Sequence, residues 1–146
     1  MNRVKTQVVW FKRDLRFTDH EPLYRALEED IPVLLVYFFE PSMMAYPDSD
    51  VRHWRFVHES LLEMQGRLED RKGQLYLFHA EVLPVFQALA SAYDIKTIYS
   101  HEEIGNGLSF QRDKDVGAFC LSAGITWKET PTNGVICRLK SRKTWQ

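Results

Sequence analysis

Cysteine is scarce in this sequence: the chain has two, Cys120 and Cys137, and they form no Cys-x-x-Cys pair. Cys120 falls in a predicted helix, where we expect it to be a small core residue. A chain with so little cysteine is most simply placed in a reducing compartment, so we expect a cytoplasmic location.

The sequence also lacks a long apolar run and an excess of charge. Its longest apolar run, residues 31–39, is far too short to cross a bilayer and contains Pro32. The run that follows the first residues is too short for a signal peptide. With 19 Lys and Arg against 20 Asp and Glu, the chain lacks the strong positive charge of a stand-alone nucleic-acid binder. The lack of a long apolar run leads us to expect no membrane partner.

Several motifs of known chemistry are missing as well. There is no glycine-rich phosphate loop, no His-Glu-x-x-His and no Gly-x-Ser-x-Gly. The histidines are scattered, and the five-residue spacing of His53 and His58 does not place them on one helix face. Gly105-Asn106-Gly107 matches part of a dinucleotide loop, but a turn that needs positive φ is the more direct interpretation. The sequence therefore predicts neither a metal site nor a catalytic nucleophile.

What the sequence does contain is an alternation of predicted strands and helices. Its 146 residues are typical of one domain, and a hydrophobic share of 45% supports a real core. Apolar runs predict strands at residues 7–11, 33–39, 74–79, 96–99 and 125–127. Apolar spacings of three and four predict helices from Pro22 through Leu27, over 51–72, from Val82 to Tyr93, and from Ser109 until Gly124. This order predicts an α/β fold with a parallel sheet.

Two features refine these predicted helices. Asp19, just upstream of the first helix, is a candidate for its N-cap. The longest helix repeats apolar residues on one face, which we expect to pack on the core: Trp54, Val57, Leu61, Met64 and Leu68.

Charged side chains gather where the predicted strands end. Residues 10–16, Trp-Phe-Lys-Arg-Asp-Leu-Arg, place three cations and one carboxylate directly after the first strand. Ligands of open α/β sheets bind at this carboxyl edge, where the loop at 40–50 and the pair Glu102-Glu103 should also lie. For residues 10–16 the alternative is a solvated loop in which Asp14 pairs with Arg13 or Arg16. For Glu102-Glu103 the alternative is that both acids are solvated.

Four ordered motifs that together span most of the chain closely resemble the DNA photolyase/cryptochrome family. They are residues 10–16 with Asp19-His20-Glu21-Pro22-Leu23, His53-Trp54-Arg55-Phe56 with Glu59-Ser60-Leu61, Tyr99 to Asn106 with Arg112-Asp113, and Asn133-Gly134-Val135 with Arg138-Leu139 and Ser141-Arg142. Lys12 departs from the pattern, because the family more often has a second arginine there.

The resemblance implies a fold and a domain plan. Residues 1–130 would form a Rossmann-like, doubly wound domain with a five-stranded parallel sheet and helices on both faces. Residues 131–146 would begin a linker toward a larger helical domain that binds FAD. The α/β domain of such proteins often helps to hold an antenna chromophore, a folate or a deazaflavin. The chain alone would then carry no complete active site.

The resemblance also implies a function. Photolyases are lyases that use blue light and reduced flavin to split pyrimidine dimers in damaged DNA, whereas cryptochromes use similar parts for signalling. A photolyase domain is the leading expectation, with a blue-light receptor as the alternative. A free-standing nucleotide-binding module is a third hypothesis, since fold alone does not fix function. The missing glycine-rich loop argues against it.

Carried over position by position, the resemblance implies a set of antenna-binding residues and no catalytic or metal-binding ones. The candidates are Arg13, Phe38, Phe39, Glu40, Arg52, Glu102, Glu103 and Asn106. Asp14 and Arg16 would stabilise the first loop. The basic tail from Arg138 to Lys143 is more consistent with a solvated linker than with DNA contact, because it lacks an aligned basic stripe.

Overall fold

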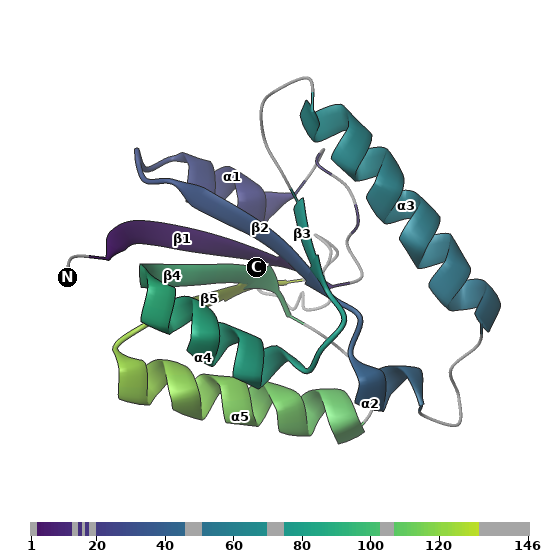
Figure 1. The fold of residues 1–146 in the computed structure, drawn as a ribbon. Helices are drawn as coiled ribbons and strands as arrows, with labels where there is room; N and C mark the ends of the chain where they lie inside the picture. The colour runs from purple at the N-terminus through teal and green to yellow at the C-terminus, as the bar shows by residue number, and fades with distance from the viewer. Residues whose placement is uncertain are drawn as a thin grey trace, which may run out of the picture.

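The computed structural model describes residues 3–12, 15, 17, 20–45, 51–69, 75–102 and 107–131. Strands and helices alternate along this part of the chain (Figure 1). Their order is β1 (Val4–Phe11), α1 (Glu21–Leu27), β2 (Val33–Phe38), α2 (Pro41–Met44), α3 (Val51–Glu69), β3 (Leu75–Phe78), α4 (Val82–Ala92), β4 (Tyr93–His101), α5 (Gly107–Ala123) and β5 (Thr126–Thr130).

The sheet has five parallel strands in the order β3-β2-β1-β4-β5, which confirms the predicted fold class. The central strand β1 pairs on both sides, with Val9 opposite Leu35 of β2 and Tyr99 of β4. The continuous apolar run of β2 has its physical reason here, because helices cover both faces of the strand. All carboxyl ends meet at one edge of this sheet.

Two core layers lie on the two faces of the sheet. Alternate residues of β1 divide between them: Val8 and Trp10 pack in one layer, and Val9 and Phe11 in the other. The first layer includes residues of α4 and α5, such as Phe86 and Val116. The second includes residues of α1 and α3. Figure 1 shows these helix pairs on opposite sides of the sheet.

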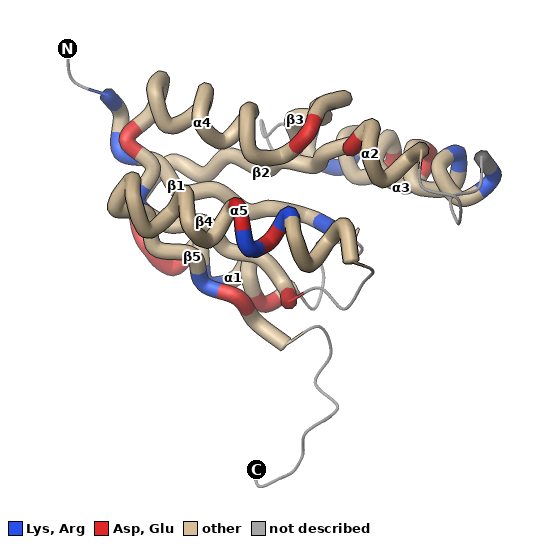
Figure 2. Tube along the Cα trace, turned by 90° about the horizontal axis from the view of Figure 1, so that it is seen from below, with Lys and Arg blue, Asp and Glu red and all other residues tan. Residues whose placement is uncertain are grey.

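The apolar stripe predicted for the longest helix packs as expected. Val57, Leu61 and Met64 of α3 are buried in the second layer, and Trp54 and Leu68 are half-buried against it. The described helix ends at Glu69; the predicted continuation to Lys72 lies outside the described residues. Lys and Arg are interspersed with Asp and Glu along the described chain (Figure 2), in line with the net charge of −1.

Several predicted boundaries were wrong, mostly where polar residues are buried by pairing. Ser100 and His101, predicted to begin a loop, extend β4, because both lie opposite residues of β5. Tyr93, predicted to end a helix, is the first residue of β4. The first strand starts earlier than predicted, at Val4, and the fifth extends to Thr130.

Other differences concern helix ends. The loop predicted at 40–50 contains the short helix α2, and Gly107, interpreted as part of a turn, begins α5. The N-cap of α1 is His20 rather than Asp19: its Nδ1 accepts a hydrogen bond from the Leu23 N–H at 3.1 Å.

Two predictions at the end of α5 are confirmed. Gly124 ends the helix with a φ of 73°, a conformation that favours glycine. Cys120 is buried, and this burial raises the pKa of its thiol to about 11. A thiol of that pKa is unreactive at neutral pH, in keeping with a core role.

Within the described residues, no helix combines the length and apolarity needed to cross a bilayer.

Candidate functional site

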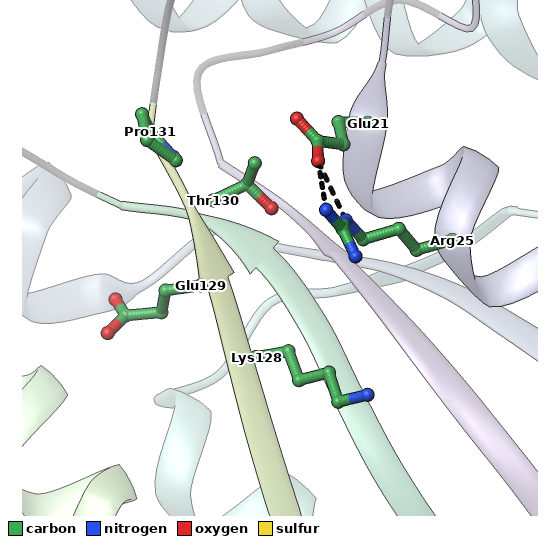
Figure 3. Close-up of a pocket in the computed structure, with 6 residues that line it drawn as sticks. All are labelled: Glu21, Arg25, Lys128, Glu129, Thr130 and Pro131. Atoms are coloured by element: carbon green, nitrogen blue, oxygen red, sulfur yellow. Dashed lines mark hydrogen bonds and ion pairs between the residues drawn. The ribbon is translucent and has the colours of Figure 1, made fainter. Parts of the chain in front are cut away.

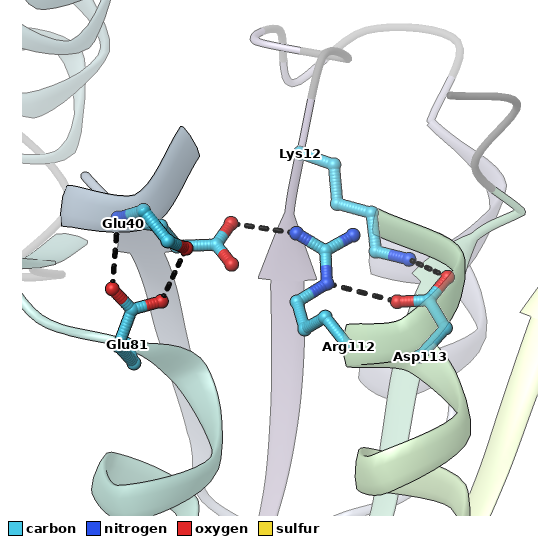
Figure 4. A network of polar contacts seen from close by, with 6 residues as sticks. Lys12, Glu40, Glu81, Arg112 and Asp113 are labelled. Carbon is cyan, nitrogen blue, oxygen red and sulfur yellow. Dashed lines mark hydrogen bonds and ion pairs between the residues drawn. The ribbon is translucent and has the colours of Figure 1, made fainter. Parts of the chain in front are cut away.

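A network of buried charges lies at the carboxyl edge of the sheet. Arg112 of α5 bridges two carboxylates, since its Nη1 lies 2.6 Å from Glu40 Oε1 and its Nε lies 2.9 Å from Asp113 Oδ1. Lys12, which follows β1, lies with its Nζ 3.6 Å from Asp113 Oδ2. Figure 4 shows the guanidinium between the two acids. The side chains of Arg112 and Glu40 are only 11% and 9% exposed, so this pair is shielded from solvent.

The cations of this network also rest on an aromatic floor. Lys12 Nζ lies 4.2 Å from the centroid of the Trp10 ring, and the guanidinium carbon of Arg112 lies 5.0 Å from it. Trp10 in turn stacks on Trp127 with centroids 5.7 Å apart, and Trp127 Nε1 donates a hydrogen bond to Ser100 Oγ at 2.9 Å. Desolvated cations over indole rings are favourable contacts. The stacked rings of Trp10 and Trp127 therefore support the buried charges by packing, in addition to the ion pairs among them.

An aromatic face lies between the end of β2 and α3, on the face of the sheet opposite to Trp10. Phe39 packs with ring centroids 6.3 Å from both Trp54 and His58, and 5.1 Å from Tyr37. Among the described residues, none accepts a hydrogen bond from the buried Nε1 atom of Trp54. Because buried indole N–H groups usually have an acceptor, the lack of one among the described residues makes Trp54 a candidate contact for a bound molecule.

The structure brings only part of the predicted antenna set together. Phe39 and Glu40 lie at the edge, whereas the ring of Phe38 packs into the core against Phe78 and Phe86. Arg52 is exposed on α3. Glu102 is exposed after β4, and its backbone N–H donates to the Thr130 carbonyl at 2.7 Å. The remaining candidates, Arg13, Glu103 and Asn106, lie outside the described residues, as do Asp14 and Arg16.

Trp54 is not singled out by the sequence as a candidate site residue, because its spacing fits the core stripe of α3. The histidines are scattered along the sequence, whereas in the structure the buried rings of His20 and His101 lie 4.8 Å apart between centroids. His20 also packs on Phe11 at 4.7 Å. No group of three metal-ligating side chains is present in the described part of the chain.

A hollow of about 370 Å³ lies between α1 and the end of β5, away from the buried network. Its lining residues are Glu21, Arg25, Lys128, Glu129, Thr130 and Pro131 (Figure 3). Arg25 is already engaged by Glu21, with Nη2 and Oε2 2.6 Å apart. In Figure 3 the Glu129 side chain points away from this pair. Positive and negative side chains offset one another here, so the hollow does not have the charge of an anion site.

The carboxyl of Glu129 interacts electrostatically with Lys12 and Asp113 of the buried network. Partial burial raises the pKa of its carboxyl, Lys12 opposes that shift, and the carboxylates of Asp113 and Glu102 add to it. The folded protein therefore holds a proton on Glu129 more tightly than the unfolded chain does. It follows that the free energy of unfolding falls as pH rises from the ordinary value of 4.5 through the raised pKa.

We expect Glu129→Gln to remove this pH dependence, because an amide does not titrate. Denaturant unfolding of both proteins at steps from pH 4 to 7 measures it. The variant should gain stability relative to the parent as pH rises through the raised pKa of Glu129. A stability difference between Glu129→Gln and the parent that stays constant with pH would contradict this account of the carboxyl.

Comparison with known proteins agrees with this architecture. The family model described as DNA photolyase matches residues 7–143. A cryptochrome DASH of Synechocystis sp. is 32% identical over 104 residues, which cover 68% of this chain and 21% of that protein. A deoxyribodipyrimidine photo-lyase of Agrobacterium fabrum is 33% identical over 91 residues, which cover 62% of this chain and 18% of that protein.

Solved structures show the same similarity in three dimensions. A cryptochrome from Synechocystis sp. matches with a TM-score of 0.80 at 26% identity, over 96% of this chain and 30% of that one. A bacterial class III photolyase from Agrobacterium tumefaciens matches with a TM-score of 0.74 at 26% identity, over 90% of this chain and 26% of that one. The chain thus spans about a fifth of the length of the curated relatives described above. Sequence and fold together show that the chain belongs to the DNA photolyase family, as an N-terminal α/β domain of photolyase and cryptochrome type.

Proposed function

We propose that this chain is the antenna-holding N-terminal domain of a photolyase, a blue-light-driven FAD enzyme that repairs pyrimidine dimers in DNA. The observation that carries the antenna role is the aromatic face at the carboxyl edge, where the Trp54 indole N–H has no acceptor among the described residues. The photolyase role is supported by the similarity to a deoxyribodipyrimidine photo-lyase.

The residues at this edge fit a flat heteroaromatic molecule with polar atoms on its rim. Phe39 and Trp54 offer ring surfaces for stacking, and Trp54 Nε1 offers a donor to a carbonyl or ring nitrogen. Arg52, at the start of α3, adds a positive charge for an acidic substituent. The pterin of a folate and a deazaflavin both have this chemistry. Such a group would absorb near-ultraviolet or blue light and pass the excitation to a flavin.

The flavin itself belongs, in this proposal, to a helical domain outside the present chain. That domain would also provide the surface for damaged DNA, so the α/β domain alone would be inactive in repair. The role of the buried network is then structural. Lys12, Arg112 and Asp113 connect the ends of β1 and β2 to α5, on the α4–α5 face of the sheet.

We expect Trp54→Ala to weaken binding of a folate or a deazaflavin by about tenfold, because the variant loses one stacking ring and one N–H donor. Titrations of the chain with 5,10-methenyltetrahydrofolate and with a deazaflavin, followed by absorption, measure this change. Trp54→Phe keeps a ring and should lie between the two proteins. Phe56→Ala, at an exposed position of the same helix, is the matched control. Equal affinities for all four proteins would exclude the Trp54 face as the site.

A signalling photoreceptor is the second candidate, favoured by the cryptochrome relatives at 32% and lower identity. Illumination of the complete gene product, loaded with FAD, in the presence of thymine-dimer DNA separates the two. Loss of dimers under blue light supports the photolyase, whereas intact dimers support a receptor. Tight binding of ATP or NAD to this chain in calorimetry would instead favour a nucleotide-binding module.

A further inference from the structure

Two carboxylates at helix starts are used in an unusual way at the carboxyl edge. A side chain at an N-cap ordinarily accepts hydrogen bonds from the first turn of its own helix. Glu40 is the N-cap of α2 and Glu81 is the N-cap of α4, yet neither side chain caps its own helix. Each carboxylate reaches instead to a different element.

The two contacts form a chain that links three helices. Glu81 accepts hydrogen bonds from the backbone N–H and the hydroxyl of Ser42 in α2, at 2.9 and 2.8 Å. Glu40, immediately before α2, accepts from Arg112 of α5 at 2.6 Å. The helix α2 is therefore held from the α4 side by one carboxylate and from the α5 side by the other (Figure 4).

The position of α2 depends on such contacts because the helix cannot hold itself. It is four residues long and none of its residues is buried. One turn of helix in water is far too short to be stable without outside support. Residues 39–40, which connect β2 to this turn, form one wall of the proposed chromophore site.

We propose that Glu81 is a positioning residue for the carboxyl edge: its hydrogen bonds to Ser42 fix α2, and through α2 they fix the wall formed by Phe39 and Glu40. We call the contact of Glu81 with Ser42 of α2 the clamp. The effect on the ligand rests on the proposed function, whereas the clamp does not. The clamp itself predicts that α2 opens locally when the carboxylate is removed, without unfolding of the sheet.

Hydrogen exchange of the chain tests the clamp without any ligand. The amides of Met44 and Ala45 donate to Glu40 and Pro41 carbonyls within α2, so their exchange reports the opening of this turn. We expect Glu81→Ala to lower their protection about tenfold, since two bonds to a charged acceptor are lost. Ser42→Ala, which keeps the backbone donor, should have a smaller effect. Glu21→Ala, which removes an exposed carboxylate paired with Arg25, should have none.

The affinity of the variant for the folate and the deazaflavin is a second measurement. It would not change if Glu81 only contributed to overall stability. We expect Glu81→Ala to weaken binding while the global unfolding midpoint stays within error of the parent. If that variant is insoluble, Glu81→Gln, which loses the charge but keeps an acceptor, should show the same changes at smaller size.

The outcomes separate the clamp from the proposed function. Reduced protection of Met44 and Ala45 in a chain that binds neither chromophore would support the clamp and count against the antenna role. Unchanged protection in Glu81→Ala would overturn the clamp. Reduced protection with unchanged affinity in a chromophore-binding chain would overturn the positioning role, as would an equal loss of protection throughout the sheet.

Discussion

Replacing Arg112 by methionine is expected to lower the free energy of unfolding by about 3–5 kcal/mol, the cost of leaving a buried ion pair without one partner. The guanidinium bridges Glu40 and Asp113 in a setting where its own side chain is 11% exposed. Methionine keeps an unbranched apolar side chain at this position but removes the charge and the guanidinium above Trp10. Equilibrium unfolding in urea, followed by circular dichroism, measures the loss.

Two further variants identify the cause of this destabilisation. Adding Glu40→Gln to Arg112→Met should recover part of the lost stability, because the amide removes a buried carboxylate that has lost its partner. Arg25→Met, which breaks the exposed pair with Glu21, should change stability little, because exposed ion pairs contribute little. A loss in Arg112→Met no larger than in Arg25→Met would show that the network is not a stabilising element.

Replacing Trp10 by alanine is expected to cost about 3–5 kcal/mol, the usual loss for a large aromatic side chain in a core. Trp10 is 1% exposed and packs edge-on against Phe38 and Phe86 and stacks on Trp127. The substitution also removes the ring beneath Lys12 and Arg112. Unfolding in urea at pH 7 is again the measurement.

The control for this core variant is Leu121→Ala, at a position that is 86% exposed and should change stability by less than about 0.5 kcal/mol. Trp10→Phe should fall between alanine and the parent, since it keeps an aromatic face of smaller area. If Trp10→Ala lowered the free energy of unfolding by less than about 1 kcal/mol, Trp10 would not be the main packing support of the buried charges.

Much of the fold could be predicted from the sequence because its signals are local. The run at β2 is apolar at successive positions since both faces are covered, and the spacing of Val57, Leu61 and Met64 records which face of α3 is buried. The polar end of β4 could not be predicted in this way. Ser100 and His101 are buried because β1 and β5 pair beside that strand, which no local pattern records.

The candidate site was less predictable because its contacts join distant parts of the chain. Arg112 and Glu40 lie 72 positions apart, and Ser42 and Glu81 lie 39 apart, so neither pair has a periodic signal. Trp54 has the spacing of a core residue, and what distinguishes it is that its N–H has no acceptor among the residues that the structure describes. The charged stretch around Lys12 was predicted to lie at the carboxyl edge of the sheet, but its ion pair with Asp113 has no signal in the sequence.

The most direct test of the central claim is an absorption spectrum of the chain after incubation with a folate or a deazaflavin and removal of the free molecule by desalting. We expect a retained near-ultraviolet or blue band, reduced in Trp54→Ala and unchanged in Phe56→Ala. A spectrum with no band from either chromophore would contradict the claim that this domain holds an antenna at the carboxyl edge of its sheet.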